Sequence, residues 1–171
     1  MRETEKYIMF WGKEDIYSNF YPIKFKHKRR TFNNSEQAFM WRKAQYFKDW
    51  QIAGEILNAK SPNHAKSLGR KVRNFNEEQW NKVRYDIMVE VVKDKFMTTH
   101  LKREILDTDL CKDFVEASPY DKIWGVGLKA NDPNILDESN WKGQNLLGKV
   151  MEDVRVHCVY NRRKNNGEVW Y

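Results

Sequence analysis

The 171-residue chain is poor in residues that cross-link or interrupt a fold, with two cysteines, four prolines and eight glycines. Cys111 and Cys158 form no CxxC pair and no Cys/His cluster, which argues against a disulfide framework and a structural zinc and favours a reducing cytosol. The four histidines are scattered, and none lies in metal-ligand spacing. We therefore expect no metal site, and we expect surface or capping roles for the histidines.

Long apolar runs are also missing. No stretch approaches the ~18 apolar residues that a membrane span needs. The charged start, MRETEKYIMFW, has no secretory signal pattern. The motifs GxSxG, HExxH and DFG and the EF-hand loop are absent as well. We expect a cytoplasmic protein without a membrane partner, and none of these well-known chemistries.

The chain is rich in positive charge and in aromatic side chains. Lys and Arg number 31 against 24 Asp and Glu, a net charge of +7, and Phe, Trp and Tyr make up 14% of the residues. Positive charge favours an anionic partner, such as a phosphorylated metabolite, a dinucleotide or a nucleic acid, and it equally serves solubility. Aromatic side chains fill cores and also stack on flat ligands such as nucleobases.

The apolar pattern predicts strands near both ends of the chain and helices between them. The expected strands are residues 7–11, 23–26, 30–32, 113–118 and 123–128, and the expected helices are 35–47, 49–58, 62–69, 77–97, 100–106 and one that opens at Gly143. This order indicates a single α+β domain, helix-rich with a small β-sheet, over residues 1–158, followed by a basic tail over 159–171 in which Trp170 could dock. The polar stretch 129–141 is the longest expected loop, typical of a lid or a binding loop.

The stretch 31–45, TFNNSEQAFMWRKAQ, places charge on an apolar helix face. Glu36, Phe39, Met40 and Lys43 are spaced i, i+3, i+4 and i+7, so they share one face. A carboxylate on an apolar face needs a partner or a function. Asn33 followed by Glu36 also resembles a capping box. Capping and catalysis both stay open for Glu36, and Lys43 also fits a solvated lysine.

Four separate segments have the composition of one pocket. They are Ser18-Asn19-Phe20, the helix that carries Glu36 and Lys43, Gly69-Arg70, and the block 116–145. Carboxylates at Glu36, Glu116 and Asp121, near a lysine and aromatic residues, suit cleavage of a glycosidic bond. One carboxylate would stabilise an oxocarbenium-like centre while an acid assists the leaving group. A lysine with a lowered pKa would instead form a Schiff base with an opened sugar aldehyde.

The glycines of the late block suggest contact between backbone and ligand. Trp124-Gly125-Val126-Gly127 would let backbone approach a ligand closely. Lys142-Gly143-Gln144-Asn145, at an expected helix start, would offer N–H groups to a phosphate. Neither segment is a Walker or GxGxxG motif, and tight packing explains the glycines as well.

Taken together, these segments resemble the YbiA-like, or NADAR, family. The resemblance rests on SNF at 18–20, SEQAFMWRKA at 35–44, GR at 69–70, a capped long helix with Trp80, WGVGL at 124–128 and KGQNLLGKVMEDVR at 142–155. Their order and spacing cover roughly residues 8–157. The resemblance implies a helix-rich α+β fold and N-glycosidase activity on ribosylated bases, for which neither metal nor organic cofactor is needed. Bacterial members act on ribosylaminopyrimidine phosphates of riboflavin synthesis, and others remove ADP-ribose from guanine in nucleic acid.

The resemblance also implies residue roles. The helix-opening glutamate of the family matches Glu36, its lysine seven residues later matches Lys43, and its aspartate before Trp-Gly matches Asp121. With Glu116, these are the expected catalytic residues. The expected substrate-binding residues are Asn19, Phe20, Arg70 (as a phosphate contact), Trp80, Trp124, Gly125, Gly127, Gly143 and Asn145.

Three functional hypotheses follow. The first is an N-glycosidase that acts on a ribosylaminopyrimidine phosphate or a related compound. The second is a hydrolase that removes ADP-ribose from guanine in DNA or RNA, and the third is a non-catalytic module that binds ADP-ribose or a nucleotide. The 129–141 insertion is longer than in the compact bacterial form, which leaves the substrate open. The basic run 162–164 fits either a grip on a polynucleotide or a solvated tail.

Overall fold

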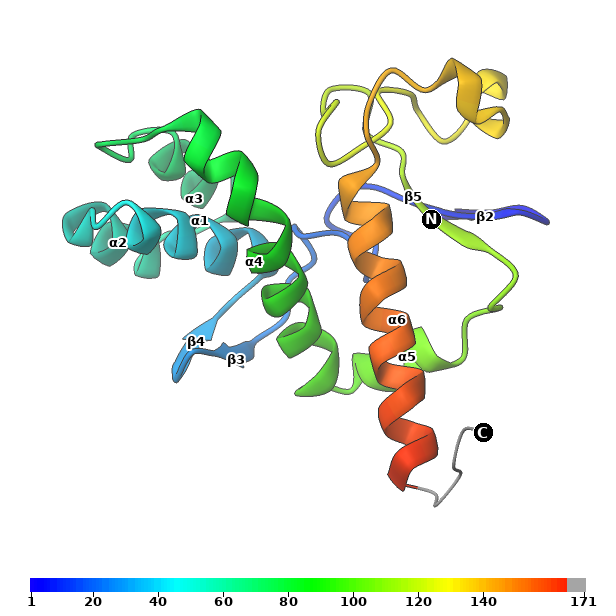
Figure 1. Cartoon of the computed structure of the whole chain (residues 1–171), viewed down its shortest axis with the longest axis horizontal. Helices are drawn as coiled ribbons and strands as arrows, with labels where there is room; N and C mark the ends of the chain where they lie inside the picture. Colours follow the sequence, from blue (N-terminus) through cyan, green and yellow to red (C-terminus); the bar gives the residue numbers. More distant parts are fainter. Residues whose placement is uncertain (166–171) are drawn as a thin grey trace.

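The computed structural model describes residues 1–165, which form two small β-sheets packed among six α-helices (Figure 1). The predicted class, helix-rich α+β, is confirmed. In chain order the elements are β1 (Arg2–Glu3), β2 (Tyr7–Phe10), β3 (Phe25–His27), β4 (Arg30–Phe32), α1 (Ser35–Tyr46), α2 (Trp50–Leu57), α3 (Pro62–Gly69), α4 (Glu77–Met97), α5 (Leu101–Leu106), β5 (Asp113–Glu116), the 3₁₀ turns η1 (Pro133–Leu136) and η2 (Glu138–Asn140), and α6 (Leu146–Asn165).

The main sheet has the strand order β1-β2-β5. Strand β2 is buried along its whole length and pairs in parallel with β5, so that Phe10 lies opposite Glu116 at the end of both strands. Strands β3 and β4 form a separate hairpin. Its turn residues Lys28 and Arg29 have φ values of 47° and 64°, as a tight hairpin turn of two left-handed residues requires.

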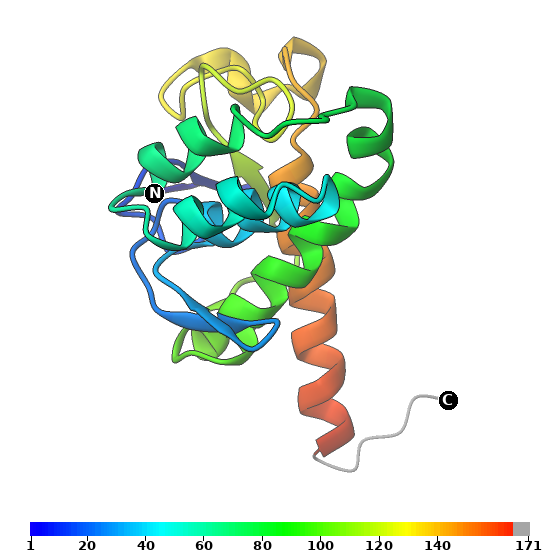
Figure 2. The same ribbon diagram turned by 90° about the vertical axis from the view of Figure 1, so that its left-hand side faces the viewer.

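Helix α4 is the central support of the molecule. It packs against α1 on one side and against α6 on the other, and α6 in turn covers β5. Figures 1 and 2 show the α1–α3 group and the β2–β5 sheet on opposite sides of α4. Tyr17 joins these layers, because its ring lies 6.0 Å from that of Phe96 on α4 and 4.8 Å from that of Phe114 on β5. Residues from both halves of the chain thus share one core.

Side-chain caps fix the helix starts. Ser61 caps α3, and Asn76 caps α4, at the starts of the predicted helices 62–69 and 77–97. Helix α1 differs by one residue: Asn34, not Asn33, accepts from the Gln37 N–H at 2.8 Å. The Gln37 side chain in turn accepts from the Asn33 N–H at 2.9 Å. The capping interpretation of Glu36 is therefore wrong, because Gln37 serves that turn.

The late block contains the largest differences from the prediction. Residues 123–128 form turns instead of a strand, and Gly127 has a φ of 73°, outside the strand region. Helix α6 begins at Leu146 instead of Gly143, because Asn145 is left-handed (φ 52°). At its other end α6 extends through Asn165, so residues 159–165 of the expected tail are helical. Residues 166–171, including Trp170, lie outside the described part.

The 129–141 loop folds onto the sheet. The Tyr7 hydroxyl donates to Glu138 at 2.9 Å, and the ring of Trp141 lies 5.9 Å from that of Tyr7. Ile135 is fully buried, and its carbonyl accepts from the Trp141 indole N–H at 2.9 Å. The loop is therefore an ordered layer on the strand β2 side of the molecule.

Lys95 is an unusual component of the interior. Its side chain on α4 is fully buried, and its ammonium donates to the carbonyls of Ile16 at 2.5 Å and Ser18 at 2.9 Å. Within residues 1–165 it has no carboxylate partner, and burial lowers its pKa to about 7. These bonds fix residues 16–18, the segment just before Asn19 and Phe20, on the side that faces α4.

Replacing Lys95 with Met should loosen this segment. The substitution removes the donor of the Ile16 carbonyl and leaves the Ser18 carbonyl with only the Tyr21 N–H at 3.3 Å. An unsatisfied buried group costs about 1–3 kcal/mol. We expect a lower free energy of unfolding in urea and faster amide exchange in peptides that cover residues 16–20. Lys93→Met, also on α4, is the control. Exchange of residues 16–20 at the wild-type rate in Lys95→Met would contradict the proposed support.

Candidate active site

Two adjoining cavities lie between α3 and the segment that follows β5. The larger has a volume of about 610 Å³ and the smaller about 220 Å³. Six residues line both cavities: Ser18, Phe20, Lys66, Glu116, Asp121 and Ile123. The linings include Ser18 and Phe20 from the first predicted segment, Glu36 from the second, and Glu116 and Asp121 from the block 116–145. Arg70, from the remaining segment, lines the larger cavity. The sequence segments predicted to form one pocket are thus brought together.

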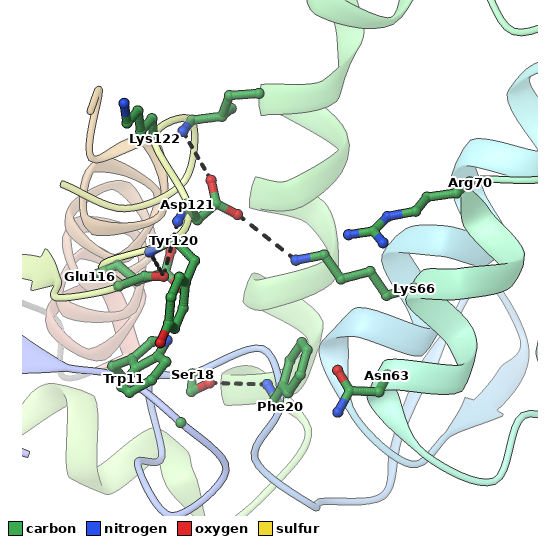
Figure 3. A pocket seen from close by; sticks show the side chains of 13 residues that line it. Trp11, Ser18, Phe20, Asn63, Lys66, Arg70, Glu116, Tyr120, Asp121 and Lys122 are labelled. Carbon is green, nitrogen blue, oxygen red and sulfur yellow. Dashed lines mark hydrogen bonds and ion pairs between the residues drawn. The ribbon is translucent and has the colours of Figure 1, made fainter. Parts of the chain in front are cut away.

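The larger cavity has two chemically different sides (Figure 3). Asn63, Lys66 and Arg70, from α3 and its C-terminal cap, stand on one side. Trp11 and Tyr120 stand on the other, with Asp121 above them in the view. One side therefore offers positive charge and hydrogen-bond donors, whereas the other offers flat aromatic surfaces.

Glu36 is positioned by the first turn of α1. Its backbone N–H donates to the carbonyl of Asn19 at 3.0 Å, and its side chain lines the smaller cavity beside Phe39 and Met40. The residue is 6% exposed. Among the described residues its carboxyl accepts no hydrogen bond. Burial raises its pKa to about 7, and Asp121 raises it further, whereas Lys66 opposes the shift.

Glu116 comes from the end of strand β5. Its N–H donates to the Asn145 side chain at 3.0 Å, and its Oε2 atom is buried with no hydrogen-bond partner among the described residues. Burial raises its pKa to about 8, and the carboxylates of Asp121 and Glu36 add to the rise. A group with this pKa keeps its proton at neutral pH. Strongly perturbed carboxyls in a cleft are typical of functional sites.

Asp121 lies between the two sides of the site. Its Oδ1 atom accepts from the N–H groups of Ile123 at 2.9 Å and Trp124 at 2.8 Å, so this oxygen shapes the turn. Its Oδ2 atom faces the Lys66 ammonium at 3.9 Å (Figure 3). Lys66 is therefore the nearest basic group to this carboxylate among the described residues, yet it is too far away for a tight hydrogen bond.

Lys43 and Trp80 lie outside the lining of both cavities. The Lys43 ammonium lies 4.1 Å from the centre of the Phe75 ring, and no ion pair joins it to Glu36 within the described residues. Burial and the Arg70 charge lower its pKa, whereas Glu36 raises it. Trp80 packs behind Phe39, with the ring centres 5.3 Å apart. A catalytic role for Lys43 and a substrate contact for Trp80 stay predictions.

The apolar wall of the smaller cavity is aromatic. Phe20, Phe39 and Trp124 line it, and the rings of Phe39 and Trp124 meet edge to face at 5.2 Å. Asn19 lies in the same wall, and its Oδ1 atom is buried without a partner while its amide nitrogen lies 3.4 Å from the Met88 sulfur. Unpartnered buried acceptors beside a cavity are rare and ask for an explanation.

Most N–H groups of the predicted phosphate site at Gly143 already have backbone partners. The N–H groups of residues 144–147 all donate to carbonyls of residues 122–125. A Cβ at Gly143 would lie 2.2 Å from the Gly125 carbonyl oxygen, and one at Gly125 would lie 2.8 Å from the Glu116 carbonyl oxygen. Glycine is therefore needed here for close packing, which was the alternative interpretation. A Cβ at Gly127 would lie 2.9 Å from the Lys142 side chain, again a packing constraint.

Asn145 is a clamp between α6 and β5. Its side chain accepts from the Glu116 N–H at 3.0 Å and donates to the Phe114 carbonyl at 2.9 Å. This pair of bonds fixes the backbone from which the Glu116 carboxyl projects. The structure thus places Asn145 behind the site, as a support for a predicted catalytic residue.

Sequence reasoning missed Lys66, Trp11 and Tyr120. Lys66 is four residues before Arg70, so both project from the same face of α3, a spacing that could have identified it. Trp11 and Tyr120 are 47% and 82% exposed, and their rings lie 6.1 Å apart. Their pairing joins the end of β2 to the segment after β5, a contact that only the fold creates.

Two searches of residues 1–165 complete the description. None of the helices there is both long and apolar enough to cross a membrane. In the same range, no group of three or more His, Cys, Asp or Glu side chains is arranged to hold a metal ion.

Comparison with known proteins gives the family. The model of the NADAR domain matches residues 9–158, so the chain belongs to the NADAR family. It is 38% identical over 165 residues to "N-glycosidase R617" of Acanthamoeba polyphaga mimivirus, covering 90% of this chain and 96% of that protein. It is 37% identical over 168 residues to "Protein irg-1" of Caenorhabditis elegans, covering 89% and 79%.

A longer bacterial relative and a solved structure extend the comparison. "Riboflavin biosynthesis protein VVA0006" of Vibrio vulnificus is 27% identical over 164 residues, which are 92% of this chain and 41% of that protein. The NMR structure of the E. coli protein YbiA superposes with a TM-score of 0.74 at 25% identity, covering 94% of this chain and 89% of YbiA. The predicted family, fold and enzyme class, an N-glycosidase, agree with these findings.

The buried glutamates should make stability fall as pH rises. Unfolded Glu36 ionises near pH 4.5, whereas the folded protein holds this proton until about pH 7. The folded state thus binds more protons between these values, and wild-type stability declines there with increasing pH. Since one pKa unit is about 1.4 kcal/mol, Glu36→Gln should raise the free energy of unfolding by up to roughly 3 kcal/mol at pH 8, with no such gain at pH 4.

Urea unfolding at both pH values measures this difference. Glu78→Gln is the control, because Glu78 is exposed and its i,i+4 pair with Lys82 is worth little. Glu116→Gln should behave like Glu36→Gln, because burial raises its pKa as well. An equal effect of Glu36→Gln at pH 4 and pH 8 would show that the Glu36 carboxyl is not the strained, buried acid described above.

Proposed function

We propose that this chain hydrolyses the N-glycosidic bond between a ribosyl group and a nucleobase-like ring. The observation that carries the proposal is the pair of buried glutamates, Glu36 from α1 and Glu116 from β5, in the wall of one small cavity. Their pKa values, about 7 and about 8, allow one to be ionised while the other is protonated. Glycosidic cleavage needs this division between a carboxylate and a carboxylic acid.

The two carboxyl groups divide the reaction between them. Glu116 donates its proton to the leaving nitrogen of the base while the C1′–N bond breaks and its electron pair moves to that nitrogen. The Glu36 carboxylate stabilises the positive charge that develops on C1′ and the ring oxygen. Water then attacks C1′ and gives its proton to Glu36. The products are the free base and the ribose hydroxyl, and exchange with solvent restores the protons.

Lys43 offers a covalent variant of the same reaction. If the ribosyl ring opens, C1′ becomes an iminium carbon still joined to the leaving nitrogen. The neutral Lys43 amine adds to C1′, and the C1′–N bond to the base breaks as that nitrogen takes a proton, which leaves a Schiff base between Lys43 and the sugar for water to hydrolyse. Burial and Arg70 lower the pKa of Lys43, which favours the neutral amine that this step needs. The ammonium now rests over Phe75, so the side chain would have to turn toward the cavity.

The cavities suit a substrate with a flat ring and a phosphate. The aromatic wall formed by Phe20, Phe39 and Trp124 fits the base beside Glu36. Arg70, which lines the larger cavity, would hold a phosphate through its guanidinium. A ribosylaminopyrimidine phosphate has both features. The name of the Vibrio relative, a riboflavin biosynthesis protein, supports this substrate class.

A second candidate substrate is ADP-ribosylated guanine in DNA or RNA. The observation that favours it is the exposed pair of Trp11 and Tyr120 beside the larger cavity, where a second flat ring could stack. A cavity of about 610 Å³ next to the reacting groups has room for a second nucleotide unit. For either substrate we place the enzyme in the cytoplasm. In the described part both cysteines are free, as in a reducing compartment.

A paired turnover assay tests the proposed function. The purified protein is offered a ribosylaminopyrimidine 5′-phosphate and, separately, a guanine-ADP-ribosylated oligonucleotide, with product release followed by chromatography. We expect release of base and ribose phosphate from the first substrate. Glu36→Gln and Glu116→Gln should each lower kcat by about 100-fold or more, because acid–base groups contribute on this scale. Glu78→Gln should match the wild type.

The other outcomes separate the alternatives. Release of ADP-ribose from the oligonucleotide, with rates that fall steeply as salt increases, would identify the second substrate. Borohydride added during turnover traps a Schiff base, and loss of the adduct in Lys43→Ala would assign it to that lysine. If neither substrate gives product and Glu36→Gln binds ADP-ribose as the wild type does, the proposed enzymatic activity is contradicted and a binding module remains.

A further inference from the structure

Lys66 occupies a position that no other described cation shares. It lines both cavities, together with Glu116 and Asp121, and Glu36 lines the smaller one. It reaches across from α3 toward the segment after β5, and its ammonium faces the free oxygen of Asp121 at 3.9 Å (Figure 3). The side chain is 38% exposed, so its charge is partly shielded from water. Lys66 is therefore a cation held among three carboxyl groups.

The groups around the two glutamates make the charge distribution unequal. Glu36 is influenced by Lys66 and Arg70 from the α3 side, by Lys43 on its own helix, and by Asp121 from the loop after β5. Glu116 is influenced by the carboxylates of Asp121 and Glu36, and among the described residues Lys66 is the cation that acts on it. Glu36 thus has three cations near it and Glu116 has one. Lys66 is common to both.

We propose that Lys66 is the positioning residue that keeps Glu36 ionised beside Asp121 and Glu116, so that the base of the reaction is available at neutral pH. Three carboxyl groups in one small space cannot all ionise, because like charges repel strongly in a poorly hydrated interior. The Lys66 ammonium offsets part of this repulsion, and it sits on the side from which α3 approaches the cavities. The proposal rests on the proposed function, since it assigns how the acid and the base of that reaction are set.

Removing the Lys66 charge should move the activity profile to higher pH. In the wild type, kcat/KM should rise as Glu36 ionises near pH 7 and fall as Glu116 ionises near pH 8. The Lys66 charge lowers the pKa of both glutamates, and an opposite charge close to a carboxyl lowers its pKa by about one unit or more. Lys66→Met should therefore shift both limbs upward by about one pH unit. Lys66→Arg keeps the charge and should restore the wild-type limbs.

Two further variants make the result specific. Lys122→Met removes a cation from the larger cavity that is not among the charges acting on Glu36 or Glu116, so both limbs should stay in place. Lys66→Gln repeats the test if Lys66→Met does not fold. Limbs of Lys66→Met that coincide with the wild type would overturn the proposal. In that case a raised KM would show a substrate contact, and a lowered kcat alone a structural role.

A direct titration separates this proposal from the proposed function. Carbon-13 NMR of labelled glutamate carboxyls reports the ionisation of Glu36 and Glu116 without any turnover, and Glu36→Gln and Glu116→Gln assign the two signals. We expect both midpoints about one pH unit higher in Lys66→Met than in the wild type. Unmoved midpoints would overturn the role of Lys66 even if the enzyme turns over. Moved midpoints without turnover would support Lys66 and count against the proposed reaction.

Discussion

The proposed reaction depends on two carboxyl groups, Glu36 and Glu116, which are buried without a hydrogen-bond partner among residues 1–165. Glu36 and Glu116 oppose the usual rule that buried charges are paired, and burial is the largest cause of the raised pKa of each. A fold tolerates such groups only when the surrounding structure fixes them. The burial that raises both pKa values lowers stability, and in the proposed reaction it supplies an acid and a base near neutral pH.

The scaffold fixes these acids from several directions. Hydrogen bonds of Asn34 and Gln37 fix the first turn of α1. In the same turn, the Glu36 N–H donates to the Asn19 carbonyl. On the opposite side, Asn145 clamps the backbone at Glu116. These supports come from residues far apart in the sequence. Site geometry therefore depends on the packing of α1 and α6 on either side of α4.

Local signals in the sequence predicted the helices well and the site in part. Ser61-Pro62 and Asn76 mark helix starts through bonds within a few residues, so the sequence suffices to find them. The strand prediction for 123–128 was wrong because Val126 and Leu128 are buried from turns that two glycines make possible, whereas Ile123 is exposed. The sequence did not reveal Lys66 as a site residue because its partner, Asp121, lies 55 positions later in the sequence, although the two side chains are 3.9 Å apart in the structure.

A crystal structure of the Glu36→Gln variant with an intact ribosyl substrate tests the account most directly. The substitution should slow cleavage enough for the bound substrate to be seen. We predict that C1′ lies against the side chain at position 36, with the leaving nitrogen within hydrogen-bond distance of the Glu116 carboxyl. A glycosidic bond held in the larger cavity, out of reach of both positions, would contradict the assignment of these two glutamates as the reacting pair.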